Sequence, residues 1–127
     1  MEKKKHIKHF RELNVYQRAF KAAMHIFEIT QSFPVNERYS LTDQIRRSSR
    51  AVCSNLAEGW RKRIYELVFK NKLTDSMMEA SETQCWLEFS LACKYIKQDT
   101  FEKLDNEYEE IIAMLNSMEM NSKKFCF

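Results

Sequence analysis

Glycine and proline are almost absent from this sequence. Its 127 residues include one glycine, Gly59, and one proline, Pro34, where average usage gives roughly nine and six. β-Turns, hairpins and nucleotide-binding loops depend on these residues for backbone shapes that others resist. Their scarcity excludes a β-sandwich, a P-loop, a dinucleotide-binding loop and a glycine-framed nucleophile elbow. It predicts a chain made of a few long helices.

The sequence also lacks long apolar runs and closely spaced cysteines. No stretch approaches the roughly 18 uninterrupted apolar residues of a membrane span, and no apolar segment follows the charged N-terminus. The four cysteines form no C-x-x-C pair, so we expect free, mostly buried thiols at Cys53, Cys85, Cys93 and Cys126. We therefore expect a cytoplasmic protein with no membrane contact and no cofactor.

The charge balance is only slightly basic. Lys and Arg number 21 against 18 Asp and Glu, a net charge of +3 at pH 7, which by itself does not indicate nucleic-acid binding. With 44% apolar and 13% aromatic residues, the chain can build a core, and its length favours one domain. We predict a basic lead-in over 1–13, a helical bundle over 14–120 and a short tail over 121–127.

Apolar residues recur at three- and four-residue steps in four segments, a spacing typical of amphipathic helices. We predict helices over 15–32, 41–61 and 65–93, and a fourth from about 101 onward. Pro34 ends the first, because the residue before a proline avoids helical geometry. Four such helices with short connections predict an all-α, antiparallel up-down four-helix bundle.

Polar residues before three of these segments predict N-terminal caps. Asn14 is the candidate cap of the first helix, and Ser40 with Asp43 matches a capping box for the second. Asp99 or Thr100 is the candidate cap of the fourth.

No catalytic or metal constellation stands out. Di-iron bundles use Glu-x-x-His pairs, and no histidine of this chain stands three residues after a glutamate. The serines at 48, 49 and 54 suit close helix packing better than catalysis. We predict a non-enzyme with no small-molecule substrate, since an enzyme would need converging titratable groups.

Arginines gather on one face of the second predicted helix. At about 100° per residue they fall within roughly a 100° arc, centred about 150° from the apolar stripe. An arginine face can bind phosphates through its planar donors. The alternative is a solvated face that pairs with Asp and Glu of a neighbouring helix. The candidate nucleic-acid contacts are Arg46, Arg47, Arg50, Arg61, Lys62 and Arg63.

The third predicted helix has a second apolar surface, on the side away from its Phe69–Leu91 stripe. A large exposed apolar patch usually marks a contact, so we favour a self-association interface anchored by Trp86 and Phe89. The alternative is the broad apolar arc of a helix that packs on two neighbours. The candidate interface residues are Met78, Cys85, Trp86 and Phe89, with Cys93 and Ile96 beside them.

Several segments resemble the four-helix bundle proteins encoded in 23S rRNA intervening sequences. Residues 39–52 (YSLTDQIRRSSRAV) and 53–63 (CSNLAEGWRKR) resemble the two halves of that family's core motif. Residues 13–19 (LNVYQRA) resemble its opening, and 79–89 (EASETQCWLEF) its third-helix motif. The likeness covers about residues 10–118.

The resemblance implies an up-down bundle that assembles into a homo-oligomeric ring, typically a pentamer. The family is similar to the accessory proteins of diversity-generating retroelements, whose basic pentameric barrel engages reverse transcriptase and nucleic acid. By position, Arg46, Arg47 and Arg50 fall in the motif that contributes basic surface there. The resemblance implies no catalytic residues.

Lys94 departs from the family pattern, because relatives often have glycine at this position. A left-handed helix cap there would cost lysine about 1 kcal/mol relative to glycine. Either Lys94 adopts that conformation or the third helix ends differently.

Together these patterns predict a non-enzymatic, homo-oligomeric bundle that binds RNA or a ribonucleoprotein partner through a basic surface. The alternative is a protein-interaction scaffold with no nucleic-acid role. The sequence identifies no particular target or partner.

Overall fold

The structure, a computed structural model, describes residues 7–127. Residues 1–6, and with them the first part of the predicted lead-in, lie outside the described residues. Four α-helices fill most of this part of the chain, and it contains no strand, which confirms the all-α prediction. The helices are α1 (Asn14–Thr30), α2 (Leu41–Arg61), α3 (Glu66–Ala92) and α4 (Gln98–Met120). Short 3-10 helices are η1 (Phe10–Glu12), η2 (Val35–Glu37) and η3 (Ser122–Lys124).

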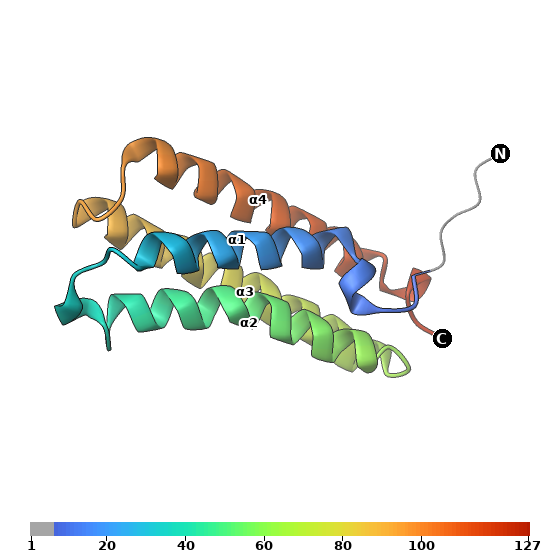
Figure 1. Ribbon diagram of the computed structural model, residues 1–127. Coiled ribbons are helices and arrows are strands. Elements are labelled where there is room, and N and C mark those ends of the chain that lie inside the picture. The colour runs from blue at the N-terminus through green and yellow to red at the C-terminus, as the bar shows by residue number, and fades with distance from the viewer. Residues whose placement is uncertain (1–6) are drawn as a thin grey trace.

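The four helices lie alongside one another, and successive helices are joined at alternating ends (Figure 1). The α1–α2 and α3–α4 connections share one end, called here the loop end. The α2–α3 turn, η1 and the C-terminus lie at the opposite end, called here the terminal end (Figure 1). The division into lead-in, bundle and tail stays a prediction.

The core lies where the apolar stripes of the four helices meet. Each helix contacts two others, in the cyclic order α1, α2, α3, α4. The largest fully buried side chains come from all four, with Ile26 on α1, Leu56 on α2, Phe69 on α3 and Tyr108 on α4. None of the helices in residues 7–127 is long and apolar enough to cross a membrane.

Small residues bring α2 and α3 close together. The Ser48 and Thr83 hydroxyls are hydrogen-bonded at 2.8 Å, and the Ser76 hydroxyl donates to the Val52 carbonyl at 3.0 Å. A Cβ added to Gly59 would lie 2.8 Å from the Cβ of Lys72 on α3. Glycine is therefore used here for close approach, and its backbone is helical.

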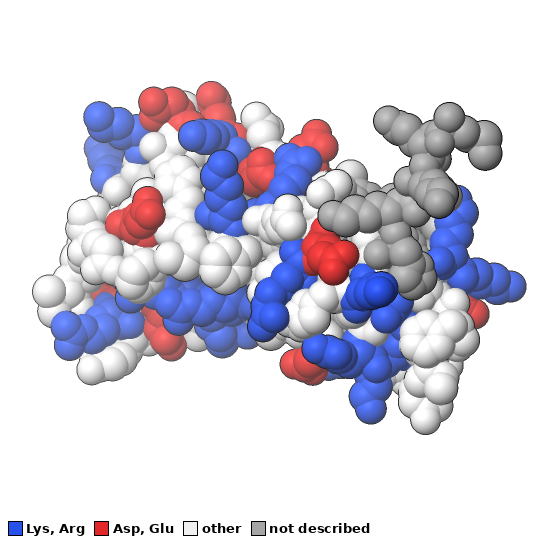
Figure 2. Space-filling model, turned by 45° about the vertical axis from the view of Figure 1, so that its right-hand side comes forward, with Lys and Arg blue, Asp and Glu red and all other residues white. Residues whose placement is uncertain are grey.

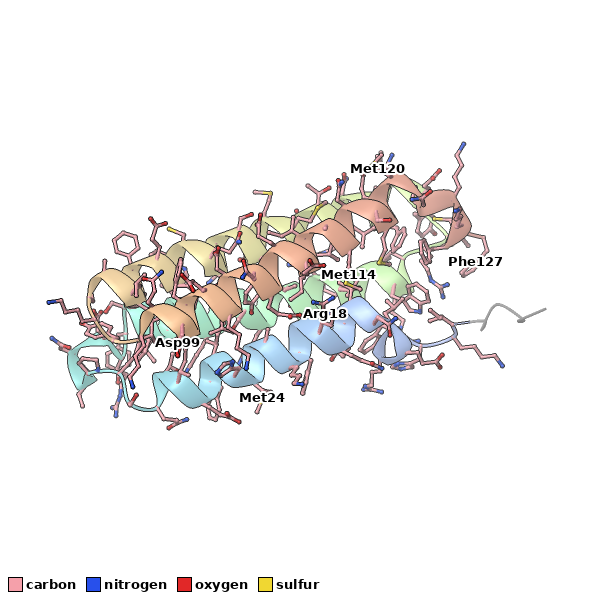
Figure 3. All side chains as sticks on the ribbon, turned by 90° about the horizontal axis from the view of Figure 1, so that it is seen from above. Arg18, Met24, Asp99, Met114, Met120 and Phe127 are labelled. Carbon is pink, nitrogen blue, oxygen red and sulfur yellow. The ribbon has the colours of Figure 1, made fainter. Side chains whose placement is uncertain are left out.

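An ion pair joins α1 to α4 on the other side of the bundle. Arg18 donates to both carboxylate oxygens of Glu107, from Nε at 2.7 Å and from Nη2 at 3.1 Å. Figure 3 shows Arg18 beside Met114 of α4, whose sulfur lies 3.6 Å from Nη1. The pair fixes α1 laterally, although both side chains remain about one-third exposed.

The predicted caps are wrong in detail. Asn14 is already helical, and the residue before it caps α1 without a side-chain hydrogen bond. Ser40 is the N-cap of α2, but its hydroxyl donates to Glu37 at 2.6 Å and leaves the helix N–H groups uncapped. α4 begins three residues earlier than predicted, at Gln98, so Asp99 lies inside its first turn.

Lys94 adopts the left-handed conformation, with φ at 63°, so the first of the two sequence alternatives is confirmed. The N–H of Tyr95 donates to the Ser90 carbonyl and that of Lys94 to the Leu91 carbonyl, both at 2.9 Å. This is the Schellman pattern that satisfies the last carbonyls of a helix. These bonds offset the backbone cost that a glycine would avoid.

The Lys94 turn directs Tyr95 onto the α1–α2 connection. The Tyr95 hydroxyl donates to Glu37 at 2.9 Å, and its ring centroid lies 5.2 Å from that of Phe33. Glu37 thus accepts from both Tyr95 and Ser40. We call Phe33, Glu37, Ser40 and Tyr95 the loop-end latch, because they join the two connections.

The cysteine expectation is half wrong. All four thiols are free, but only Cys53 is buried. Burial raises the pKa of the Cys53 thiol to about 12. Cys85 and Cys93 are exposed because they lie on the outer side of α3 and at its end.

Candidate nucleic-acid interface

The six predicted basic contacts fall into two groups along α2. Arg46, Arg47 and Arg50, called here the α2 arginines, lie on the half of α2 nearer the loop end. Arg61 ends the helix at the terminal end, where Lys62 and Arg63 follow it. Arg61 is eleven positions after Arg50, which is about 16 Å along a helix. The structure therefore offers two basic surfaces where the sequence indicated one face.

The α2 arginines line one concave surface together with Arg38 and Tyr39. Their charged groups nevertheless diverge. Arg46 is half-buried and turns towards α1, where its Nε donates to the Thr30 hydroxyl at 2.8 Å. Its guanidinium carbon lies 4.8 Å from the ring centroid of Phe27, a cation–π distance.

Arg47 turns the opposite way, towards α3. Its Nη1 is 3.3 Å from a Glu79 oxygen, and its Nη2 donates to Glu82. The hydrogen bond that Arg47 donates to Glu79 is the largest influence raising the pKa of Arg47, and the charges of both carboxylates add to it. This matches the alternative expectation, in which the arginine face pairs with acidic residues of a neighbouring helix.

Arg50 has the fewest polar contacts of the α2 arginines within residues 7–127. It is exposed, and its guanidinium carbon lies 5.8 Å from the Phe27 centroid. It borders a shallow apolar groove between α1 and α2 that includes Phe20, Met24 and Ala57. Of the three, only Arg50 is exposed and has no carboxylate partner among the described residues.

Arg63 fastens the C-terminal tail to the terminal end. Its guanidinium carbon lies 3.6 Å from the Trp60 ring centroid and 5.1 Å from that of Phe127. Its Nε donates to the Trp60 carbonyl at 2.8 Å and its Nη1 to the Phe125 carbonyl at 3.3 Å. Desolvation is the main cause that lowers the pKa of Arg63. Arg63 therefore has a structural role, holding the tail against the end of α2.

Trp60 is the centre of this end. Only 3% of it is exposed, and its ring centroid lies 6.2 Å from that of Phe125. Its indole N–H donates to the Lys8 carbonyl at 3.4 Å. One side chain thus joins the segment before α1, the end of α2 and the tail.

Arg61 extends past the end of α2 to the segment before α1. Its Nη2 lies 3.3 Å from Nε2 of His9, and its guanidinium carbon lies 5.9 Å from the Phe10 centroid. Arg11 contacts the same two rings. Lys62 is exposed and has no hydrogen bond from its side chain among residues 7–127.

Three chain segments therefore contribute basic side chains to the terminal end, and Figure 2 shows lysine and arginine atoms at this end as well as over the rest of the face. Within residues 7–127 none of them lies within 4.0 Å of a carboxylate. We call this surface the basic end. Its members are Lys8, Arg11, Arg61, Lys62, Arg63, Lys123 and Lys124.

Comparison with known proteins places the chain in a family. Residues 11–117 match the 23S rRNA-intervening sequence protein family. The chain belongs to this family. This confirms the resemblance indicated by the motifs. No curated protein matches the chain.

One solved structure similar to this family member is a crystal structure of a protein of unknown function. It comes from the S23 ribosomal protein family of Bacteroides thetaiotaomicron. The TM-score is 0.73 at 30% identity, over 83% of this chain and 97% of that one. The likeness covers nearly the whole of the other chain, so the helical fold is shared.

The basic end of this family member extends beyond the matched region. Arg11 and Arg61–Arg63 lie inside the match, whereas the tail from Lys123 to Phe127 follows it. Sequence periodicity left this tail unspecified. The composition of the tail could have indicated its role, because two lysines precede two phenylalanines. Phe125 contacts Trp60, and Phe127 contacts Arg63.

The outer side of α3 is the second candidate surface of this family member. Met78 is 66% exposed and Phe89 54% exposed, and Leu67 extends the same apolar face. Trp86 differs from them, because it is half-buried and packs against the core. Its indole donates to Glu82 at 3.2 Å. We call Leu67, Met78, Cys85 and Phe89 the α3 face.

Proposed function

We propose that this family member is a non-enzymatic, cytoplasmic helical bundle that binds RNA, or a ribonucleoprotein partner, through its basic end. The observation that supports this best is that basic side chains from three segments meet there. Within the described residues, no carboxylate oxygen lies within 4.0 Å of their charged nitrogens. Uncompensated lysines and arginines attract polyanions, and the release of counterions from a nucleic acid favours the complex.

The α2 arginines have a lesser part in this proposal. Arg47 is neutralised by Glu79 and Glu82, and Arg46 is occupied by Thr30 and Phe27. Breaking such contacts to reach a phosphate would cost part of the binding energy. Arg50 is the α2 arginine best able to contact a further phosphate of an RNA that is bound at the basic end.

The proposal includes assembly of antiparallel up-down bundles into a homo-oligomeric ring, a pentamer by family resemblance. The support from this chain is the α3 face, because exposed apolar side chains of this size usually mark a contact. Cyclic symmetry repeats each surface around one axis. With helices along that axis, all the basic ends would share one rim and bind a long RNA together.

The second candidate function is a protein-interaction scaffold without a nucleic-acid role. It is favoured by the internal pairing of Arg47 and by the apolar α3 face, which would suit an apolar protein surface. It predicts binding that depends weakly on salt. RNA binding predicts the opposite.

The function is tested by fluorescence anisotropy of structured RNA fragments between about 50 and about 200 mM salt. The proposal predicts binding that weakens steadily as salt rises, because each phosphate contact releases counterions. Absent binding, or binding insensitive to salt, would contradict it and favour the scaffold.

Assembly is tested separately by light scattering at micromolar concentration. Phe89→Asp should shift the oligomer to smaller species while helicity is retained, because Phe89 is exposed in the single chain. Asn106→Asp is the matched control, since it adds the same charge at an exposed position on α4. A monomeric wild-type chain, or equal effects of the two variants, would refute the role of the α3 face.

A further inference from the structure

Two arginines from distant parts of the chain converge on one histidine at the basic end. Nη1 of Arg11 lies 3.4 Å from Nε2 of His9, and Nη2 of Arg61 lies 3.3 Å from the same nitrogen. The other ring nitrogen, Nδ1, accepts a hydrogen bond from the backbone N–H of Arg11 at 3.2 Å. Three donor-bearing groups thus face a small region of the surface.

The hydrogen bond to Nδ1 determines whether Nε2 is a donor or an acceptor. A backbone N–H can only donate, so Nδ1 carries the lone pair and Nε2 of the neutral ring carries the proton. An Nε2–H group cannot accept from either guanidinium. The guanidinium nitrogens of Arg11 and Arg61, 3.4 and 3.3 Å from Nε2, therefore have no acceptor there, and the donors of all three side chains lie next to one another.

The Phe10 ring holds the two arginines in this arrangement. The guanidinium carbons of Arg11 and Arg61 lie 5.1 and 5.9 Å from its centroid. Phe10 itself packs against the core and stands 5.1 Å, edge to face, from Tyr16. The donors are thus supported by the bundle, which lowers the entropy lost when they bind an anion.

We propose that His9, Arg11 and Arg61 form a clamp for a single phosphate group. A phosphate presents several acceptor oxygens at hydrogen-bond spacing, which suits guanidinium forks and an imidazole N–H. Its negative charge also relieves the repulsion between two neighbouring guanidinium groups. The assignment of this phosphate to RNA rests on the proposed function, whereas the clamp itself rests on the donors.

The clamp is tested first without RNA, by titrating the wild-type chain with methyl phosphate and with dimethyl phosphate. The clamp predicts saturable NMR shifts of the His9 imidazole and of the Arg11 and Arg61 side-chain N–H groups. A preference for methyl phosphate indicates a terminal monoester, and equal binding indicates an internal diester. No shifts, or equal shifts at Lys62 and Lys124, would overturn the clamp.

The second arm uses RNA and the variants Arg11→Gln and Arg61→Gln. Each should weaken binding about tenfold and reduce the slope of log affinity against log salt by about 0.9, the loss of one phosphate contact. Lys97→Gln is the matched control, because it removes one exposed charge at the loop end. Circular dichroism checks that each variant is folded.

The two arms separate the clamp from the proposed function. If RNA binds but the clamp variants behave like Lys97→Gln, the clamp is wrong and the function stands. If the small phosphates saturate the clamp while no RNA binds, the clamp stands and the function is wrong.

Discussion

At the loop end a carboxylate is the centre of the structure, whereas at the terminal end cations rest on aromatic rings. Glu37 accepts hydrogen bonds from Ser40 at 2.6 Å and from Tyr95 at 2.9 Å. At the other end Arg63 lies 3.6 Å from the Trp60 centroid, and Arg61 lies beside Phe10. The loop-end contacts join two connections between helices, and the terminal-end contacts join the segment before α1, the end of α2 and the tail.

The two ends differ in how many of their hydrogen-bonding groups have a partner within the chain. The loop-end latch matches hydroxyl donors to a carboxylate acceptor, so its polar groups are satisfied within the chain. An aromatic ring attracts a guanidinium but accepts none of its in-plane N–H groups. The basic end is therefore held together without being neutralised, and its donors remain available to an anion, apart from those that Arg63 gives to the Trp60 and Phe125 carbonyls.

The largest expected effect is on stability and comes from Trp60→Ala. This change removes a nearly buried side chain that joins three segments, so the free energy of unfolding should fall by about 3–5 kcal/mol. Urea denaturation measures the loss. Tyr95→Phe at the loop end should cost only about 1 kcal/mol. A loss for Trp60→Ala no larger than that for Tyr95→Phe would contradict the role of Trp60 in joining the three segments.

Arg63→Gln should have the next largest effect. It removes the cation from the Trp60 ring and the guanidinium hydrogen bonds to the Trp60 and Phe125 carbonyls. We expect a loss of about 1–2 kcal/mol, with faster hydrogen exchange in the tail. Lys62→Gln removes the same charge next to it and should change stability by less than about 0.5 kcal/mol. Equal effects would show that Arg63 acts only through its charge.

Arg47→Gln should have a smaller effect. Arg47 pairs with Glu79 and Glu82, but its side chain is 47% exposed, so water screens much of the attraction. We expect a loss of at most about 1 kcal/mol that shrinks further in high salt. Its RNA affinity should stay near that of the wild type. A large loss of RNA binding would show that the ion pairs open to admit phosphate.

The most local prediction concerns the titration of the loop-end latch. The hydrogen bond to Glu37 is the main cause that raises the pKa of Tyr95 from 10.0 to about 12. A raised pKa means that the neutral phenol stabilises the fold below pH 10, and that this contribution disappears as pH rises through about 12. Phenolate absorbance measures it. Glu37→Gln should lower the pKa of Tyr95, and an unchanged value would contradict the latch.

The pKa of Glu37 shifts in the opposite direction to that of Tyr95. Hydrogen bonds from Ser40 first, and then from Tyr95, hold the pKa of its carboxyl below the usual range. Its contribution to stability is therefore present above the ordinary glutamate pKa and is lost as pH falls through the lowered one. The latch weakens at both extremes of pH and is intact between them.

Helix number and core could be predicted from the sequence because they depend on spacing along the chain. Leu56 and Phe69 recur in stripes of period 3.6, and burial follows from that period. The caps could not be predicted in this way. Ser40 has a choice of local partners, and its hydroxyl donates to Glu37 instead of accepting from the helix.

The two basic surfaces were harder to separate, because an arginine side chain is long enough to turn towards either neighbouring helix. Arg46 and Arg47 are adjacent in sequence, yet one contacts α1 and the other α3. The basic end depends on contacts between residues far apart, such as Arg61 with His9. Periodicity within one helix has no information on such contacts.

RNA binding by the basic end can be tested with two double variants that lose equal charge. Arg61→Gln with Lys62→Gln alters the basic end, and Arg46→Gln with Arg50→Gln alters the α2 arginines. RNA affinity is measured for both across the same salt range. If RNA binds at the basic end, the Arg61→Gln/Lys62→Gln variant should bind at least about tenfold more weakly and lower the slope of log affinity against log salt by about two, with a smaller change for the Arg46→Gln/Arg50→Gln variant. An equal or larger loss in the Arg46→Gln/Arg50→Gln variant would contradict binding at the basic end.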